Sequence, residues 1–247
     1  MTENKATTDG AMSLLDHLDE LRSRLLRCVV AFGVAFSVCW AFSDTLLDFL
    51  LEPIRTHLFE GGEIVFIHLP EPFLIYMKAA ALAAIFLAAP YVLYQAWAFV
   101  APGLYRSEKR LAIPFLMFGT LFFTVGGAFG YYVAVPVAAN WLIDLGSSFK
   151  ASITLRSAFQ FESWIVLGMG AVFEMPIVIF FLSRIGVVTP RFLLKNFRIA
   201  LLVIAVLAAL LTPTGDMLTM SVFAGPMILL YLLGILVAWV FGKKKDP

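Results

Sequence analysis

The chain has 247 residues, of which 61% are hydrophobic and only 14% are charged, and its formal net charge is +1. A soluble domain carries about 25% charged residues, and one of this size could not hide so much apolar surface from water. The composition excludes an ordinary soluble fold, gives no support to nucleic-acid binding, and predicts an all-α integral membrane protein.

The sequence carries none of the common catalytic or nucleotide-binding motifs: GxxxxGK[ST], HExxH, GxSxG and CxxC are all missing. Cys28 and Cys39 are eleven residues apart in one apolar stretch, which is roughly 16 Å along a helix and too far for a disulfide. The three histidines have no partner at metal-ligand spacing. We therefore expect no enzyme, no cofactor and no metal.

Six apolar stretches are candidates for membrane helices, each of which needs about 20 residues to cross about 30 Å of hydrocarbon. The fifth has 15 residues and reaches only roughly 22 Å, and Gly225-Pro226 interrupts the sixth. No linker divides the chain, so residues 1–247 form one domain with a cytoplasmic N-terminal helix in residues 1–24. The expected spans are residues 25–42, 73–94, 111–135, 161–183, 197–211 and 217–241.

The basic residues set the orientation, because they resist translocation. With both termini in the cytoplasm, 14 of the 18 Lys and Arg residues lie on inner segments. We predict this orientation for the chain. Of the two longer outer connections, residues 44–72 are acidic, with a surface helix expected over 45–59 and an extended run over 64–67. The other spans residues 136–160 and begins at Pro136.

Two inner segments combine acids with basic or aromatic side chains. Glu20 and Arg24 precede the first span at i,i+4 spacing, which is typical of a local ion pair on an interfacial helix. The same segment could present acids to a partner. The loop after the second span carries Phe99 and Glu108 among Trp, Tyr and Arg residues. These aromatics could belong to the membrane-interface belt, with Glu108 paired to a neighbouring arginine, or they could form a binding site.

Glu174 lies near the middle of the fourth expected span, where an ionisable group is costly and normally faces a protein interior. Pro176 follows two residues later and removes a backbone hydrogen bond. A functional role is favoured over a structural one, because an uncharged residue meets a structural need more easily. Further prolines interrupt the spans and predict bent helices around a concavity, and Asp216 is expected to cap the sixth span.

Ordered sequence segments carry a family resemblance. They are His17–Leu25 before the first span, Glu71-Pro72-Phe73 at the start of the second, Pro90–Tyr105 with Glu108, Phe173-Glu174-Met175-Pro176 in the fourth, and Leu211-Thr212-Pro213 before the sixth. Over essentially its whole length the chain resembles the TatC family of the twin-arginine protein translocase. The resemblance implies a six-span fold shaped like a cupped hand, with short fifth and sixth spans, in the bacterial cytoplasmic (inner) membrane.

The resemblance also implies a function and its residues. TatC proteins are receptors for twin-arginine signal peptides of folded cargo, and they assemble with single-span TatA- and TatB-type subunits, as homo-oligomers, for export driven by the proton-motive force. The implied signal-peptide site comprises Glu20, Glu108, Phe99, Arg22 and Arg24. Glu174 and Pro176 are implied as an intramembrane docking site, and the residues with an expected structural or gating role are Pro53, Gln95 and Asp216.

The chain also departs from the family pattern in three places. Met220 and Leu232 stand where the family commonly has Gln and Glu, and Gly215 looks like an insertion, so partner docking along the sixth span is less securely implied. One alternative function stays open: a proton-coupled transporter of a small solute that uses Glu174. Such a transporter would not need an acidic patch on the inner surface, so that patch discriminates the two.

Overall fold

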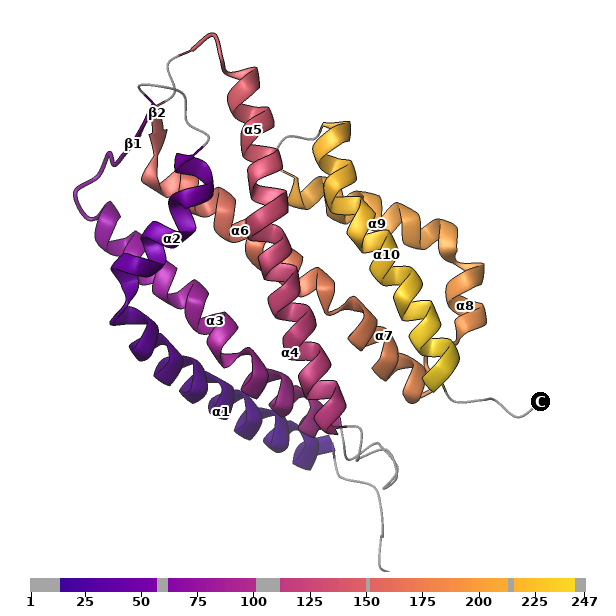
Figure 1. Cartoon of the computed structure of the whole chain (residues 1–247). Helices are drawn as coiled ribbons and strands as arrows, with labels where there is room; N and C mark the ends of the chain where they lie inside the picture. Colours follow the sequence, from indigo (N-terminus) through magenta and orange to yellow (C-terminus); the bar gives the residue numbers. More distant parts are fainter. Residues whose placement is uncertain (1–13, 57–61, 101–111, 150–151, 213–215, 243–247) are drawn as a thin grey trace, which may run out of the picture.

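The computed structural model describes residues 14–56, 62–100, 112–149, 152–212 and 216–242. Within these ranges the chain forms ten α-helices, one π-helical segment and one two-stranded sheet (Figure 1). In chain order they are α1 (Leu14–Trp40), α2 (Ser43–Arg55), β1 (Glu63–Val65), α3 (Glu71–Val100), α4 (Ala112–Phe129), η3 (Gly130–Ala134), α5 (Val135–Leu145), β2 (Ser152–Thr154), α6 (Leu155–Phe173), α7 (Met175–Arg184), α8 (Pro190–Lys195), α9 (Phe197–Leu211) and α10 (Met217–Phe241).

Five helical stretches in the described part are long and apolar enough to cross a membrane, which confirms the all-α membrane fold. The expected fifth span is the shorter apolar helix α9, whose 15 residues match the range predicted from the sequence. The count of six spans and the placement of both termini inside stay predictions. The five long stretches are His17–Trp40, Glu71–Phe99, Leu116–Leu145, Leu155–Arg184 and Thr219–Phe241.

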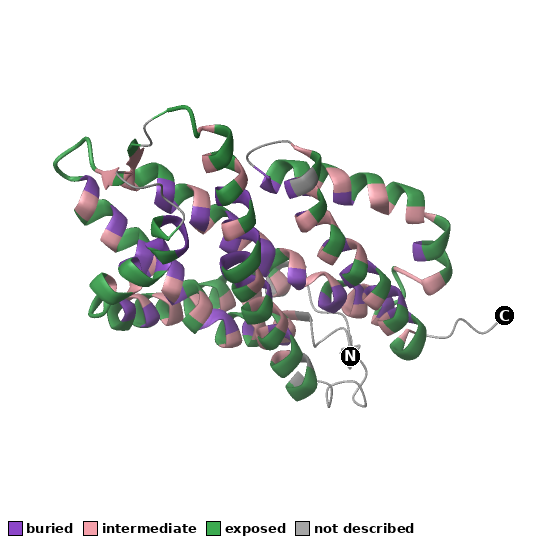
Figure 2. Cartoon of the chain, turned by 45° about the horizontal axis from the view of Figure 1, so that its top comes forward, coloured by how far each residue is buried: buried purple, intermediate pink, exposed green. Residues whose placement is uncertain are grey.

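Helix α1 packs along α3, and α4 to α7 separate this pair from α8, α9 and α10 (Figure 1). The contact between α1 and α3 is a narrow strip in which Ala35 and Cys39 meet three alanines of α3, Ala80, Ala84 and Ala88. Small side chains let two membrane helices approach closely. Most of α1 faces outward (Figure 2). From Leu25 onward most of its exposed side chains are apolar, as expected for a helix surrounded by lipid.

Helices α4 and α6 approach closely because glycines lie between them. A Cβ atom added to Gly126 would lie 2.6 Å from the carbonyl oxygen of Met169, and one added to Gly130 would lie 3.0 Å from Cα of Val166. Real Cβ atoms essentially never come within 3.0 Å of such atoms. The core on either side of this contact includes Ile165 and the other buried side chains of α6.

The third apolar helix continues through Pro136. The prediction that an outer connection begins at this residue is therefore wrong. Helix α5 runs on to Leu145. Inside an α-helix, proline has no N–H to donate, and its ring clashes with the carbonyl group four residues earlier. The turn before it, Gly130–Ala134, is π-helical, which changes the hydrogen-bonding pattern there. Pro136 then stands in the first turn of α5, where its missing N–H is not needed.

The helix expected over residues 45–59 is observed as α2, Ser43–Arg55. Its apolar face packs against α3, α5 and α6, and Leu51, Pro53 and Ile54 are buried. Beside it, β1 pairs with β2 in parallel, with Ile64 opposite Ile153. The predicted extended run over 64–67 is therefore strand only as far as Val65.

Candidate functional site

The N-terminal part of α1 and the C-terminal part of α3 are joined by a hydrogen-bonded network centred on Arg24. Arg24 donates through Nε and Nη2 to Oε1 of Glu20, at 2.9 and 2.6 Å. Its Nη1 donates to Oε1 of Gln95 on α3, at 3.2 Å. The i,i+4 pair expected from the sequence is present, and Gln95, which is buried, ties it to the neighbouring helix. The carboxylate of Glu20 is thus held in one position.

An aromatic pair lies beside this carboxylate. The rings of His17 and Phe99 are stacked, with centroids 4.3 Å apart and planes 17° apart. Nδ1 of His17 is 3.9 Å from Oε2 of Glu20, and this oxygen has no hydrogen-bond partner among the described residues. Phe99 and Glu20 therefore share one small surface, which the sequence alone did not establish.

Of the two remaining residues of the expected signal-peptide site, the structure describes only Arg22. Arg22 is exposed on α1, two residues from Glu20. Glu108, the second expected acid, lies outside the described residues. The structure therefore brings together Glu20, Arg24, Gln95 and Phe99.

Glu174 lies at a break between two helices within the fourth apolar stretch. Helix α6 ends at Phe173 and α7 begins at Met175, with Pro176 in its first turn. Its side chain points toward α4, where a Cβ added to Gly119 would lie 3.7 Å from Oε2. Oε1 of Glu174 and the hydroxyl of Thr120 are buried without hydrogen-bond partners in the described part of the chain. The break thus places the carboxyl group of Glu174 against α4 beside Gly119.

Glu162 is a buried acid that the sequence analysis did not single out. It is 1% exposed, and neither carboxylate oxygen has a hydrogen-bond partner within the described ranges. The expected fourth span began at residue 161, which put Glu162 at the membrane surface. Because α6 begins six residues earlier, at Leu155, Glu162 lies two turns inside. Helical spacing could have found it, since the inward stripe comprises Phe159, Glu162, Val166, Met169 and Phe173.

Two further acidic residues accept hydrogen bonds at the N-terminal ends of helices. Asp216 caps α10 as predicted, accepting a hydrogen bond from the backbone N–H of Thr219 at 2.8 Å. Glu71, at the first position of α3, is buried and accepts three backbone N–H bonds. The donors are Ile67 at 3.1 Å, His68 at 3.3 Å and Arg156 at 3.0 Å. Glu71 therefore fixes the start of α3 against that of α6.

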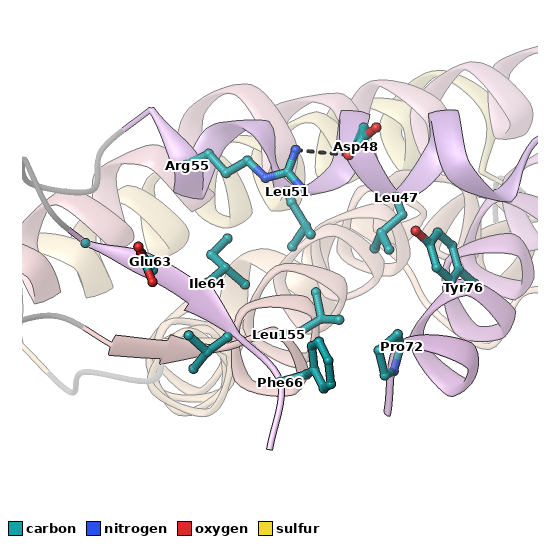
Figure 3. A pocket seen from close by; sticks show the side chains of 12 residues that line it. Leu47, Asp48, Leu51, Arg55, Glu63, Ile64, Phe66, Pro72, Tyr76 and Leu155 are labelled. Carbon is teal, nitrogen blue, oxygen red and sulfur yellow. Dashed lines mark hydrogen bonds and ion pairs between the residues drawn. The ribbon is translucent and has the colours of Figure 1, made fainter. Parts of the chain in front are cut away.

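A pocket of about 570 Å³ lies between α2, β1 and the starts of α3 and α6 (Figure 3). Leu51, Ile64 and Tyr76 line its apolar part, and the ion pair between Asp48 and Arg55, at 2.9 Å, lies on its rim. The candidate site residues proposed from the sequence do not line this pocket.

Comparison with known proteins places the chain in a family. The family described as Sec-independent protein translocase protein (TatC) matches residues 16–226. A Sec-independent protein translocase protein TatC of Koribacter versatilis is 43% identical over 95% of this chain and 88% of its own length. The one of Campylobacter jejuni is 40% identical over 95% of each.

Two solved structures are also similar. A crystal structure of the twin arginine translocase receptor TatC has a TM-score of 0.78 at 30% identity, and covers 91% of this chain and 98% of the other. A second, in the detergent DDM, has a TM-score of 0.81 at 31% identity, and covers 92% and 100%.

Fold and relatives together define an all-α membrane protein that is a component of a protein-transport system and not an enzyme. The chain belongs to the TatC family of Sec-independent protein translocase proteins.

Proposed function

We propose that this chain is the core receptor of a twin-arginine translocase and binds twin-arginine signal peptides at the cytoplasmic face of the bacterial inner membrane. The observation that carries the proposal is the fixed carboxylate of Glu20 beside the stacked rings of His17 and Phe99. A guanidinium is planar, forms fork-shaped hydrogen bonds to carboxylates and stacks on aromatic faces. The cluster offers both kinds of contact at one place.

The two oxygens of Glu20 have different roles in this proposal. Arg24 of the same helix holds Oε1, and Gln95 holds Arg24 in turn. An incoming arginine therefore binds Oε2, which is buried beside Nδ1 of His17 and has no hydrogen-bond partner in the described part of the structure. Because Glu20 is already oriented, little side-chain entropy is lost on binding. Glu108, in the inner loop that follows α3, supplies a carboxylate for the second arginine.

The proposed receptor has both termini in the cytoplasm and assembles with TatA- and TatB-type single-span subunits and with further copies of itself. The excess of basic residues on the inner segments supports this orientation. The buried polar atoms of Glu174 and Thr120, which have no hydrogen-bond partner among the described residues, support a membrane-embedded contact with a single-span partner, because a polar group in hydrocarbon gains from a hydrogen bond across helices. Export of folded cargo, driven by the proton-motive force, is the activity expected of the assembly.

Binding of two signal peptides to the purified chain tests the receptor proposal. The peptides differ only in their adjacent basic pair, Arg-Arg in one and Lys-Lys in the other, so non-specific attraction to the acidic site is the same. The arginine peptide should bind roughly 10- to 150-fold more tightly, because a charge-assisted hydrogen bond is worth about 1.5–3 kcal/mol and Lys lacks the fork geometry. Equal dissociation constants would refute the assignment.

Glu174 gives a second expected result, measured by crosslinking to the single-span subunits and by transport. Glu174→Gln keeps hydrogen-bonding capacity and should retain much of both, whereas Glu174→Ala should weaken crosslinking by roughly 3- to 30-fold, since such bonds are worth about 0.6–2 kcal/mol. The control is Thr124→Ala on α4, whose exposed hydroxyl bonds to its own helix at Thr120 O. Loss of transport in Glu174→Gln with unchanged crosslinking would instead indicate proton coupling.

A further inference from the structure

Arg27 lies on a part of α1 that hydrocarbon should surround. Helix α1 ends at Trp40, and tryptophan is enriched at the membrane–water interface. Arg27 precedes Trp40 by 13 residues, roughly 20 Å along the helix. Since a hydrocarbon core is about 30 Å thick, Arg27 lies roughly 10 Å inside the other boundary. Its side chain is exposed on the surface of the chain, so it faces lipid and not the protein interior.

Arg27 lines a groove of about 450 Å³ between α1 and α3, two helices that lie side by side (Figure 1). The remaining lining residues are Ser23, Leu26, Val30 and Ala31 of α1 and Tyr91 of α3. The spacing of the α1 residues places them on one face of the helix, and helical side chains lean toward the N-terminus of their helix. The stem of Arg27 therefore leads along the groove toward Ser23, the end nearer the network at Arg24.

Arg27 has no hydrogen bond or ion pair with another residue in the described part of the chain. The nearest acid in the sequence, Glu20, is already bonded to Arg24. An unpaired charge inside hydrocarbon is costly. Arg27 therefore needs an anion from outside the described residues, and the groove beside it is open to lipid, because Leu26 and Val30 are exposed.

We propose that Arg27 binds the phosphate of an anionic phospholipid whose acyl chain lies in the groove against Leu26 and Val30. A guanidinium binds phosphate through two parallel hydrogen bonds, and the long stem of arginine lets its charge reach toward the head groups. The hydroxyl of Ser23 is a further donor at this end of the groove. A carboxylate on a partner's helix would bring a second costly charge into hydrocarbon, whereas a lipid phosphate is already at the membrane surface. Anionic head groups are preferred over zwitterionic ones because no ammonium group offsets their attraction to arginine.

Native mass spectrometry of the delipidated protein in detergent tests the proposal, with phosphatidylglycerol and phosphatidylcholine at equal concentrations and with matched acyl chains. The wild type should retain phosphatidylglycerol in preference, and Arg27→Gln should weaken its retention by about fivefold, the usual effect of one basic residue on an anionic lipid. Arg191→Gln is the matched control, because Arg191 is exposed on α8 and does not line the groove. It removes the same charge and should bind both lipids as the wild type does.

A second pair of variants tests the groove itself in the same assay. Val30→Trp fills the groove and should lower the retention of both lipids several-fold. Val29→Trp is its control, because Val29 is the adjacent residue of α1 and does not line the groove. Both valines are exposed, so neither replacement disturbs the core of the protein.

Three results would overturn the proposal. The first is phosphatidylglycerol retained by Arg27→Gln as well as by Arg191→Gln, and the second is lipid retained by Val30→Trp as well as by Val29→Trp. The third is crosslinking of Val30→Cys to a partner's helix in membranes with no lipid retained, which would show that the occupant is a protein. The lipid assay contains no signal peptide, so its outcome is independent of the proposed receptor function.

Discussion

Replacing Glu20 and Glu108 together by glutamine should weaken the binding of a twin-arginine peptide by about 100-fold or more. Each carboxylate that loses its charge-assisted hydrogen bonds should lower affinity by roughly 10- to 150-fold. Glutamine is chosen at position 20 because its amide oxygen can still accept from Arg24, so the link from α1 to Gln95 is kept. The measurement is the dissociation constant of a labelled signal peptide with purified protein.

The matched control for this double variant is Asp19→Asn. Asp19 is an exposed acid next to Glu20 on α1, and its replacement changes net charge by the same amount as each single variant. It should leave affinity within about twofold of wild type, because an exposed charge makes only a weak, screened contribution. Wild-type affinity in the double variant would exclude these two acids as the signal-peptide site.

The second large effect is expected at Gly126, where α4 meets α6. Gly126→Ala should lower the free energy of unfolding by about 1–3 kcal/mol, the usual cost of overpacking. The added Cβ would lie 2.6 Å from a backbone carbonyl and 2.7 Å from Phe173, and backbone atoms cannot move aside cheaply. Thermal unfolding in detergent measures the difference.

The control is the same substitution at Gly33 on α1, which should raise the free energy of unfolding instead of lowering it. A Cβ added there would meet no atom within 4 Å, so the substitution acts only through helix propensity. Gly33→Ala should therefore stabilise the protein by about 0.5–1 kcal/mol. If both variants shift the unfolding temperature in the same direction, the contact at Gly126 is not what limits the approach of α4 and α6.

Much of the fold could be predicted because hydropathy directly reports which helices are long and apolar. Helix ends were harder to predict, since they depend on local caps and turns. Helix α6 begins six residues before the expected boundary of the fourth span, and the side chain of Thr154 caps it by accepting a hydrogen bond from the backbone N–H of Ser157 at 3.2 Å. Helix α3 likewise runs past residue 94, the expected end of the second span, to Val100.

The candidate site was predictable only where its contacts are local in sequence. Glu20 and Arg24 are four residues apart, so one helix suffices to pair them. The bond from Arg24 to Gln95 spans 71 positions and depends on which face of α3 meets α1, which periodicity cannot decide in a helix that is apolar on all sides.

The π-helical segment Gly130–Ala134 affects how this chain is compared with its relatives. A π-turn contains one more residue than an α-turn. Beyond it, each residue of this chain therefore occupies the position that the preceding residue would occupy in an uninterrupted α-helix. One residue corresponds to about 100° of rotation. An alignment to a relative with an uninterrupted helix therefore needs a one-residue gap between Phe129 and Val135. Without this gap, the buried Ala139 would be matched to the position that the exposed Asn140 occupies in this chain.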